Sequence, residues 1–129
     1  MVKKIIIIAV IIAVIAGLAV WYFTRPPKEP EPSSYSPGEY FITNIQESNK
    51  LFRTDIILRL SRDDQLEFLE ENNYIIRDII LFTLRDKTEE ELRAAGAQQG
   101  LRDEIISSLK DKLGIDYITA IYFNEYIIQ

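Results

Sequence analysis

The sequence contains no cysteine and no histidine. Without cysteine the protein has no disulfide, no thiol nucleophile and no site for lipid attachment through sulfur. Without either residue type, the usual zinc, haem and catalytic-triad sites cannot be assembled. The net charge of −5 argues against nucleic acid as a partner, because surfaces that bind nucleic acid are basic. We therefore expect no metal, no cofactor, no nucleic acid and no small-molecule substrate.

Charge is also missing from one long stretch near the N-terminus. The nineteen residues Ile5–Phe23 carry no charged side chain, and twelve of them are Ile, Val, Leu or Phe. As a helix this stretch would be roughly 28 Å long, close to the thickness of the hydrocarbon core of a bilayer. Residues 1–23 are therefore predicted to form a transmembrane anchor. The residues predicted to lie at the membrane interface are Lys3, Lys4, Trp21, Tyr22 and Arg25.

A cleavable signal peptide is the alternative for this segment, since Gly17–Ala19 supplies small residues at a plausible cleavage spacing. Against it, the apolar run is longer than the usual core of a signal peptide. Lys3 and Lys4 favour a cytoplasmic N-terminus, although Arg25 and Lys28 partly balance them. Together with the acidic C-terminal part, this predicts a single-pass protein of the inner (cytoplasmic) membrane with a periplasmic, extracytoplasmic body.

Proline is confined to one short region, since all five prolines lie between Pro26 and Pro37. Proline-rich chain favours the extended polyproline II form, so residues 24–38 are predicted to be a linker of about 30–45 Å. Two alternatives stay open for it: a disordered connection, or a spacer whose length matches a partner that also projects from the membrane. Residues 39–129 then form the single folded domain.

Two strands are expected at the start of this domain, one in Glu39–Ile45 and one in Leu51–Leu60. The second alternates like a strand that is buried on one face only. Its predicted buried residues are Phe52, Thr54, Ile56, Leu58 and Leu60. A helix is predicted to follow and to run to about Arg85, with a weak point at Asn72–Asn73.

Thr88 and Glu91 have the spacing of a capping box, and Gly96 is suited to stop the short helix that this box begins. A further helix is predicted to end at Gly114. The order of strands and helices predicts an α+β domain, with helices on one face of a small antiparallel sheet.

The chain ends with a strand-like segment that is apolar on both faces if its side chains simply alternate. Ile121, Phe123 and Ile127 then share one face, and Tyr122 and Tyr126 lie on the other. Such a strand is buried on both faces or offers one of them to a partner. Tyr122 and Tyr126 are the candidate partner-binding residues.

Several short motifs in this order resemble the flagellar basal-body FliL family. They are an Arg-Asp-Ile-Ile helix segment at Arg77–Ile80, a capped turn at Lys87–Leu92, a helix start at Gly100–Leu101 and an aromatic final strand at Tyr122–Gln129. The resemblance covers about residues 40–129. Asn124 and Tyr126 depart from the commonest form of the ending, where Thr or Ser and Phe are more usual.

This resemblance implies a non-enzymatic accessory protein of the bacterial flagellar motor, concerned with flagellar rotation, cell motility and chemotaxis. Proteins of this kind associate with the basal body and the stator units, and they support torque and swimming or swarming. Their extracytoplasmic domain is similar to the stomatin-type scaffold domain. The resemblance therefore also implies a homo-oligomer, ring-like around the stator.

Two other classes of function are alternatives to this one. A glycosidase needs only two carboxylates, but the candidate acids Asp63, Asp64 and Glu89–Glu91 lie at helix starts, where capping explains them. A membrane-tethered scaffold of a secretion or pilus system would share the same overall plan. Association with stator proteins would distinguish it from the flagellar interpretation.

Overall fold

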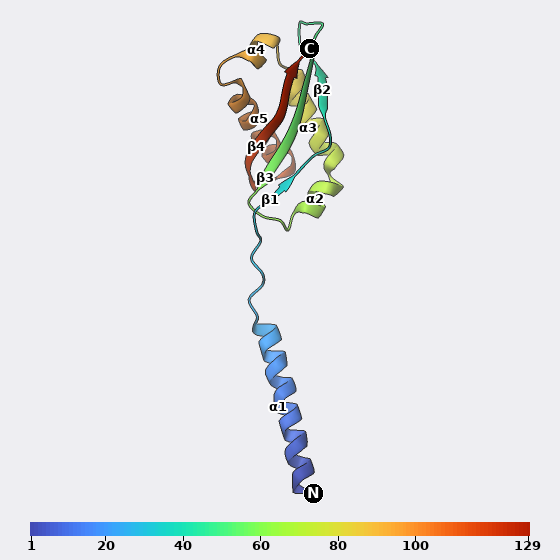
Figure 1. The fold of residues 1–129 in the computed structure, drawn as a ribbon, viewed down its shortest axis with the longest axis vertical. Coiled ribbons are helices and arrows are strands. Elements are labelled where there is room, and N and C mark those ends of the chain that lie inside the picture. The colour runs from blue at the N-terminus through green and yellow to red at the C-terminus, as the bar shows by residue number, and fades with distance from the viewer.

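The computed structural model describes the whole chain, Met1–Gln129, and has an α+β body joined to an isolated N-terminal helix (Figure 1). The helices are α1 (Val2–Thr24), α2 (Leu66–Glu71), α3 (Asn73–Arg85), α4 (Glu89–Arg93) and α5 (Ala97–Leu113). The strands are β1 (Ser33–Tyr35), β2 (Phe41–Asn44), β3 (Leu51–Leu60) and β4 (Ile118–Ile128). The predicted α+β class and the N-terminal apolar helix are confirmed.

The sheet is antiparallel and is built around β3. The whole length of one edge of β3 pairs with β4, the last strand of the chain. Along its other edge, β2 pairs with the first residues of β3 and β1 with the last ones. The polypeptide thus enters the sheet at one end of β3 and finishes at the opposite end (Figure 1).

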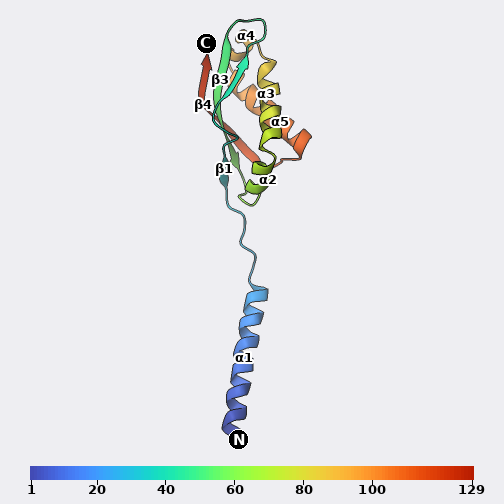
Figure 2. The same cartoon turned by 90° about the vertical axis from the view of Figure 1, so that its right-hand side faces the viewer.

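All helices of the body lie on the same side of this sheet, as the second view shows (Figure 2). The alternation of β3 is confirmed, because its five predicted core residues are all fully buried. They pack against the apolar stripes of α3 and α5, which include Ile76, Ile80, Ile105 and Leu109. The core therefore lies between one face of the sheet and a single layer of helices.

The predicted helix boundaries hold in part. The helix start expected at Gly100–Leu101 is wrong, because α5 already begins at Ala97. The weak point before α3 is real, since α2 and α3 are separate helices that meet at Asn72. Thr88 and Glu91 form the expected capping box at the start of α4. Gly114 ends α5 in the left-handed conformation. Gly96 is left-handed too, but α4 already ends at Arg93, so Gly96 precedes α5 instead of stopping α4.

Strand β4 contains two bulges that the simple alternation did not anticipate. Thr119 and Asn124 have no opposite residue in β3, and each extra residue moves the following side chains to the other face. The helix-facing side thereby collects most of the large apolar residues of the strand: Ile118, Ile121, Phe123, Tyr126 and Ile128. The prediction that Tyr122 and Tyr126 share a face is wrong, and so is the grouping of Ile127 with Ile121.

Strand β1 lies within the segment that the sequence assigned to the linker. Ser33–Tyr35 pairs with Leu58–Leu60, and the ring of Tyr35 is buried. Proline ends at Pro32 on one side of this strand and resumes only at Pro37 on the other. The extended connection between α1 and the sheet is therefore restricted to Arg25–Pro32.

Candidate membrane anchor and interaction surface

Helix α1 has the length and composition of a membrane-spanning helix. Its 23 residues include a window with a mean hydropathy of 2.9, and none of that window is buried against the body. A core helix of a soluble domain would be covered by other elements, whereas α1 stands apart from them (Figure 1). At about 1.5 Å per residue it is roughly 34 Å long, which fits a single-pass anchor.

The predicted interface residues lie at the two ends of α1. Lys3 and Lys4 are in its first turn, whereas Trp21 and Tyr22 are in its last turn. The guanidinium of Arg25 lies 5.3 Å from the centre of the Trp21 ring, within cation–π range. The helix therefore carries charge before the apolar stretch, and aromatic rings with a cation after it.

The structure separates the two tyrosines proposed as partner-binding residues. Tyr122 is on the outer face of the sheet, opposite Ile57, and 52% of it is exposed. The ring of Tyr126 instead lies 4.7 Å from that of the buried Phe52 and 5.8 Å from that of Phe123. Its hydroxyl donates a hydrogen bond of 2.6 Å to the backbone carbonyl of Leu92. Only Tyr122 is therefore available on the uncovered face.

This outer face of the sheet mixes apolar and charged side chains. The guanidinium of Arg53 lies 3.7 Å from the centre of the Tyr40 ring and forms an ion pair of 3.5 Å with Glu125. Ile42, which is 56% exposed, and Tyr122 are its large exposed apolar residues on strands β2 and β4. No helix covers this side (Figure 2). It is a surface of the kind that another protein can cover.

Arg77, the first residue of the Arg77–Ile80 motif, fixes the entry of the chain into the body. Its two terminal nitrogens donate hydrogen bonds to the carbonyls of Pro37 at 3.1 Å and of Tyr40 at 3.0 Å. The guanidinium also lies 4.3 Å from the centre of the Phe41 ring. The motif is visible in the sequence, but this role depends on a contact between residues far apart in the chain.

Four of the five acidic residues considered for catalysis have structural partners, and Glu90 is the exception. Asp64 forms an ion pair with Arg62, and this hydrogen bond lowers the pKa of the Asp64 carboxyl. Glu89 binds Lys50 at 2.8 Å and Arg93 at 3.0 Å, which lowers its pKa as well. Glu91 closes the capping box. No group of three or more carboxylates gathers closely enough to hold a metal ion.

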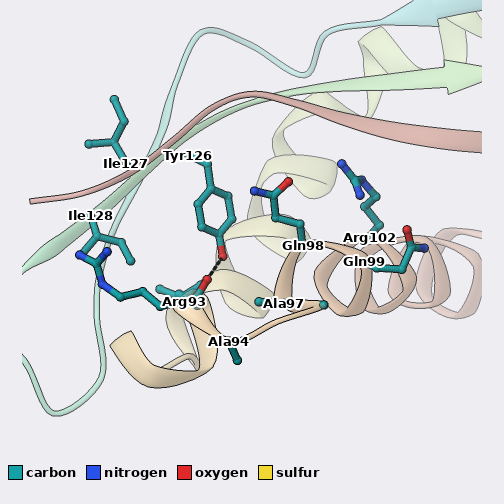
Figure 3. Close-up of a pocket in the computed structure, with 11 residues that line it drawn as sticks. Arg93, Ala94, Ala97, Gln98, Gln99, Arg102, Tyr126, Ile127 and Ile128 are labelled. Carbon is teal, nitrogen blue, oxygen red and sulfur yellow. Dashed lines mark hydrogen bonds between the residues drawn. The ribbon is translucent and has the colours of Figure 1, made fainter.

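A cleft of about 720 Å³ lies between the C-terminal half of β4 and the segment that joins α4 to α5 (Figure 3). Tyr126, Ile127 and Ile128 line it from the strand. Arg93 and Arg102 line it from the helices, and none of its lining residues is acidic. Nothing in the sequence indicated this cleft, since it depends on how α5 packs beside the end of β4.

Comparison with known proteins agrees with this architecture. The family model described as "Flagellar basal body-associated protein FliL" matches residues 35–129, which comprise the whole body from the end of β1 onwards. The "Flagellar protein FliL" of Aquifex aeolicus (strain VF5) is 26% identical over 110 residues. The alignment covers 81% of this chain and 68% of that protein. This chain belongs to the family of the flagellar basal body-associated protein FliL.

Proposed function

We propose that this protein is a membrane-anchored, non-enzymatic accessory component of the flagellar motor, which associates with the stator units and supports torque and motility. The single observation that carries the proposal is the family match over the whole body, combined with an apolar helix long enough to anchor it. Asp64, Glu89 and Glu91 are occupied by ion pairing and capping, which also favours a binding role over an enzymatic one.

In this proposal α1 crosses the inner membrane with its N-terminus in the cytoplasm, and the body is extracytoplasmic. The connection Arg25–Pro32 would hold the body roughly 25 Å from the membrane in polyproline II geometry. This distance is shorter than the composition suggested, because β1 takes part of the presumed linker into the sheet. The body would therefore act close to the membrane surface.

We further propose that copies of the protein associate through the outer face of the sheet, in a ring-like homo-oligomer. Tyr122 and Ile42 give this face exposed apolar area, and the Arg53–Glu125 pair gives it fixed charges. Tyr126 does not contribute to this face, because its side chain packs against the core. Anchoring in one membrane raises the local concentration of the bodies, which favours weak association.

Affinity purification of the tagged full chain from detergent-solubilised membranes tests the assignment to the motor. Stator proteins should co-purify with the wild-type chain. The Tyr122→Ser variant should remain folded and should lose self-association. Co-purification of secretion or pilus components in place of stator proteins would contradict the flagellar role.

A further inference from the structure

One edge of β4 has no strand beside it. Leu51 and Gln129 exchange two backbone hydrogen bonds of 2.6 and 2.9 Å, so Gln129 directs its peptide groups at β3. In an antiparallel pair the peptide groups of alternate residues point towards the partner strand and away from it. The N–H and C=O groups of Tyr126 and Ile128 consequently point to the unpaired edge, where no strand lies.

The earlier part of the same edge is protected. The Nε–H of Arg102 on α5 donates a hydrogen bond of 2.9 Å to the backbone carbonyl of Ile121. The guanidinium also lies 5.2 Å from the centre of the Phe123 ring. Folded proteins usually block exposed sheet edges, because an open edge is a template for another strand. Here the block stops before Tyr126, where the cleft begins.

The cleft beside this open edge has a charge that is opposite to that of the protein as a whole. The chain has a net charge of −5, yet Arg93 and Arg102 are the only charged residues that line the cleft. Arg93 already binds Glu89, whereas Arg102 forms no ion pair within the chain. A partner with a carboxylate would therefore complement Arg102.

We propose that this cleft binds an extended peptide segment of another protein, which adds to the open edge of β4 as a further strand and places an Asp or Glu side chain beside Arg102. The peptide groups of Tyr126 and Ile128 supply the backbone hydrogen bonds, and Arg102 supplies selectivity for an acidic side chain. A groove between a strand edge and a helix is a known arrangement for this mode of recognition. The inference does not depend on which complex the protein joins.

Geometry disfavours a second copy of this chain as the occupant. A symmetric pair of β4 edges would run antiparallel and would place the two anchors at opposite ends of the pair. The acidic connection of a neighbouring copy, with Glu29 and Glu31, leaves the body beside β1, at the opposite end of β3 from the cleft (Figure 1). Copies anchored side by side in one membrane would not bring these parts together.

The test uses the full-length protein in lipid nanodiscs and a display library of random eight-residue peptides. The most enriched peptide is synthesised, and its dissociation constant is measured for the wild type and for variants of Ile128 and Arg102. Ile128→Pro removes an N–H that points away from β3, so the pairing with β3 is preserved, although the change also shortens a side chain that packs against the core. Ile128→Val is the matched control for packing. Arg102→Lys keeps the positive charge and changes the shape of the side chain, whereas Arg102→Gln removes the charge.

We expect the selected peptides to carry Asp or Glu and to bind more weakly as salt increases. Ile128→Pro should weaken binding about tenfold, as expected for the loss of one peptide hydrogen bond, whereas Ile128→Val should not. Arg102→Gln should weaken binding of the peptide and reduce its salt dependence. Arg102→Lys should retain most of the affinity and most of the salt dependence. In the wild type, the bound peptide should slow amide hydrogen exchange at Tyr126 and Ile128.

Other outcomes would overturn the proposal. They are a failure to enrich any peptide, enrichment of peptides without acidic residues, and unchanged exchange at Tyr126 and Ile128 in the presence of the peptide. Because hydrogen exchange is measured on the wild type, it tests strand addition at this edge even if Ile128→Pro fails to fold. If sedimentation shows that a folded Ile128→Pro variant loses self-association and peptide binding is unchanged, the occupant of the edge is a second copy and the proposal is wrong.

Discussion

The hydroxyl of Tyr126 donates a hydrogen bond of 2.6 Å to the backbone carbonyl of Leu92, and this bond joins the C-terminal strand to the short helix α4. The same ring packs edge-on against the buried Phe52. Burial of the hydroxyl raises the pKa of Tyr126. Where the sequence suggested a contact residue for a partner, the structure has a side chain that holds the end of the fold in place.

Replacing Tyr126 with Phe keeps the ring and removes only this hydrogen bond. The free energy of unfolding should fall by about 0.5–1.5 kcal/mol, the net value of one intramolecular hydrogen bond. Urea unfolding of the body measures the change. Tyr122→Phe is the matched control, because its exposed hydroxyl has no hydrogen bond within the chain and its loss should change stability by less than about 0.5 kcal/mol. Equal effects at the two positions would contradict this assignment.

Stability should also fall at high pH because of buried tyrosine hydroxyls. Burial raises the pKa values of Tyr117 and Tyr126 above the ordinary value of 10.0. Above pH 10 the unfolded chain loses these protons while the folded chain still holds them, so the free energy of unfolding decreases as the pH rises. Below pH 10 the contribution is fully present.

Unfolding free energies measured between pH 8 and about pH 11 test this dependence. Tyr117→Phe and Tyr126→Phe should each make the alkaline decrease less steep, and the double variant should show the smallest decrease. A double variant with the same slope as the wild type would show that other groups cause the alkaline loss of stability.

The bulge at Asn124 determines which residues of β4 face the core. Deleting Asn124 should make the pairing continuous and leave Tyr126 and Ile128 on the core face, because Phe123 and Glu125 already lie opposite consecutive residues of β3. Deleting Ile127, which does have an opposite residue in β3, should instead turn Ile128 towards the outer face, because a shift of one residue reverses every following side chain. We expect the unfolding free energy to fall by about 1.5–3 kcal/mol for the Ile127 deletion and to change by less than about 1 kcal/mol for the Asn124 deletion. Urea unfolding of the two variants measures the difference, and equal losses would contradict the assigned bulge.

Gly38 is required where the chain enters the body. Its φ is +134°, and an added Cβ would lie 2.5 Å from a terminal nitrogen of Arg77. The two terminal nitrogens of Arg77 donate hydrogen bonds to the carbonyls of Pro37 and Tyr40, which lie on either side of Gly38. Gly38→Ala should therefore destabilise the body by about 1–3 kcal/mol. Gly100→Ala is the matched control. Nothing lies within 4 Å of a Cβ at Gly100 inside α5, so that change should stabilise the body by about 0.5–1 kcal/mol. Thermal unfolding measures both.

Topology reporters fused after Gln129 test the proposed orientation. An uncharged span between Lys3–Lys4 and the acidic body should place the C-terminus outside the cytoplasm. We expect activity from a reporter that works only in the periplasm, and none from a reporter that works only in the cytoplasm. The reverse pattern would overturn both the orientation and the association with extracytoplasmic parts of the motor.

The parts of the fold that were predictable depend on local chemistry. The alternation of β3, the break before α3 and the capping box at Thr88 are each determined by residues close together in the sequence. The faces of β4 were not predictable. Its bulges at Thr119 and Asn124 are defined by pairing with β3, which lies about sixty residues earlier in the chain. Neither residue type marks a bulge by itself.

The candidate site also has a part that the sequence predicts and a part that depends on contacts between distant residues. The anchor was readable from composition alone, because a membrane requires one continuous apolar stretch. The cleft beside β4 requires Arg102 to reach the edge at Ile121, and this contact exists only after α5 has packed. Strand β1 was likewise not predictable, because its segment has the serine and proline composition of a linker. It becomes a strand because it pairs with the last residues of β3.

The arrangement of the strands has a mechanical consequence. β3 and β4 run along the line from the anchored end of the body to its far end (Figure 1). A pull between the membrane and a partner held at the far end would act parallel to these strands, whereas their hydrogen bonds are perpendicular to them. Such tension loads the bonds together in shear instead of opening them one by one. The rate of forced unfolding, rather than the equilibrium stability, then determines how long the body holds under such a load.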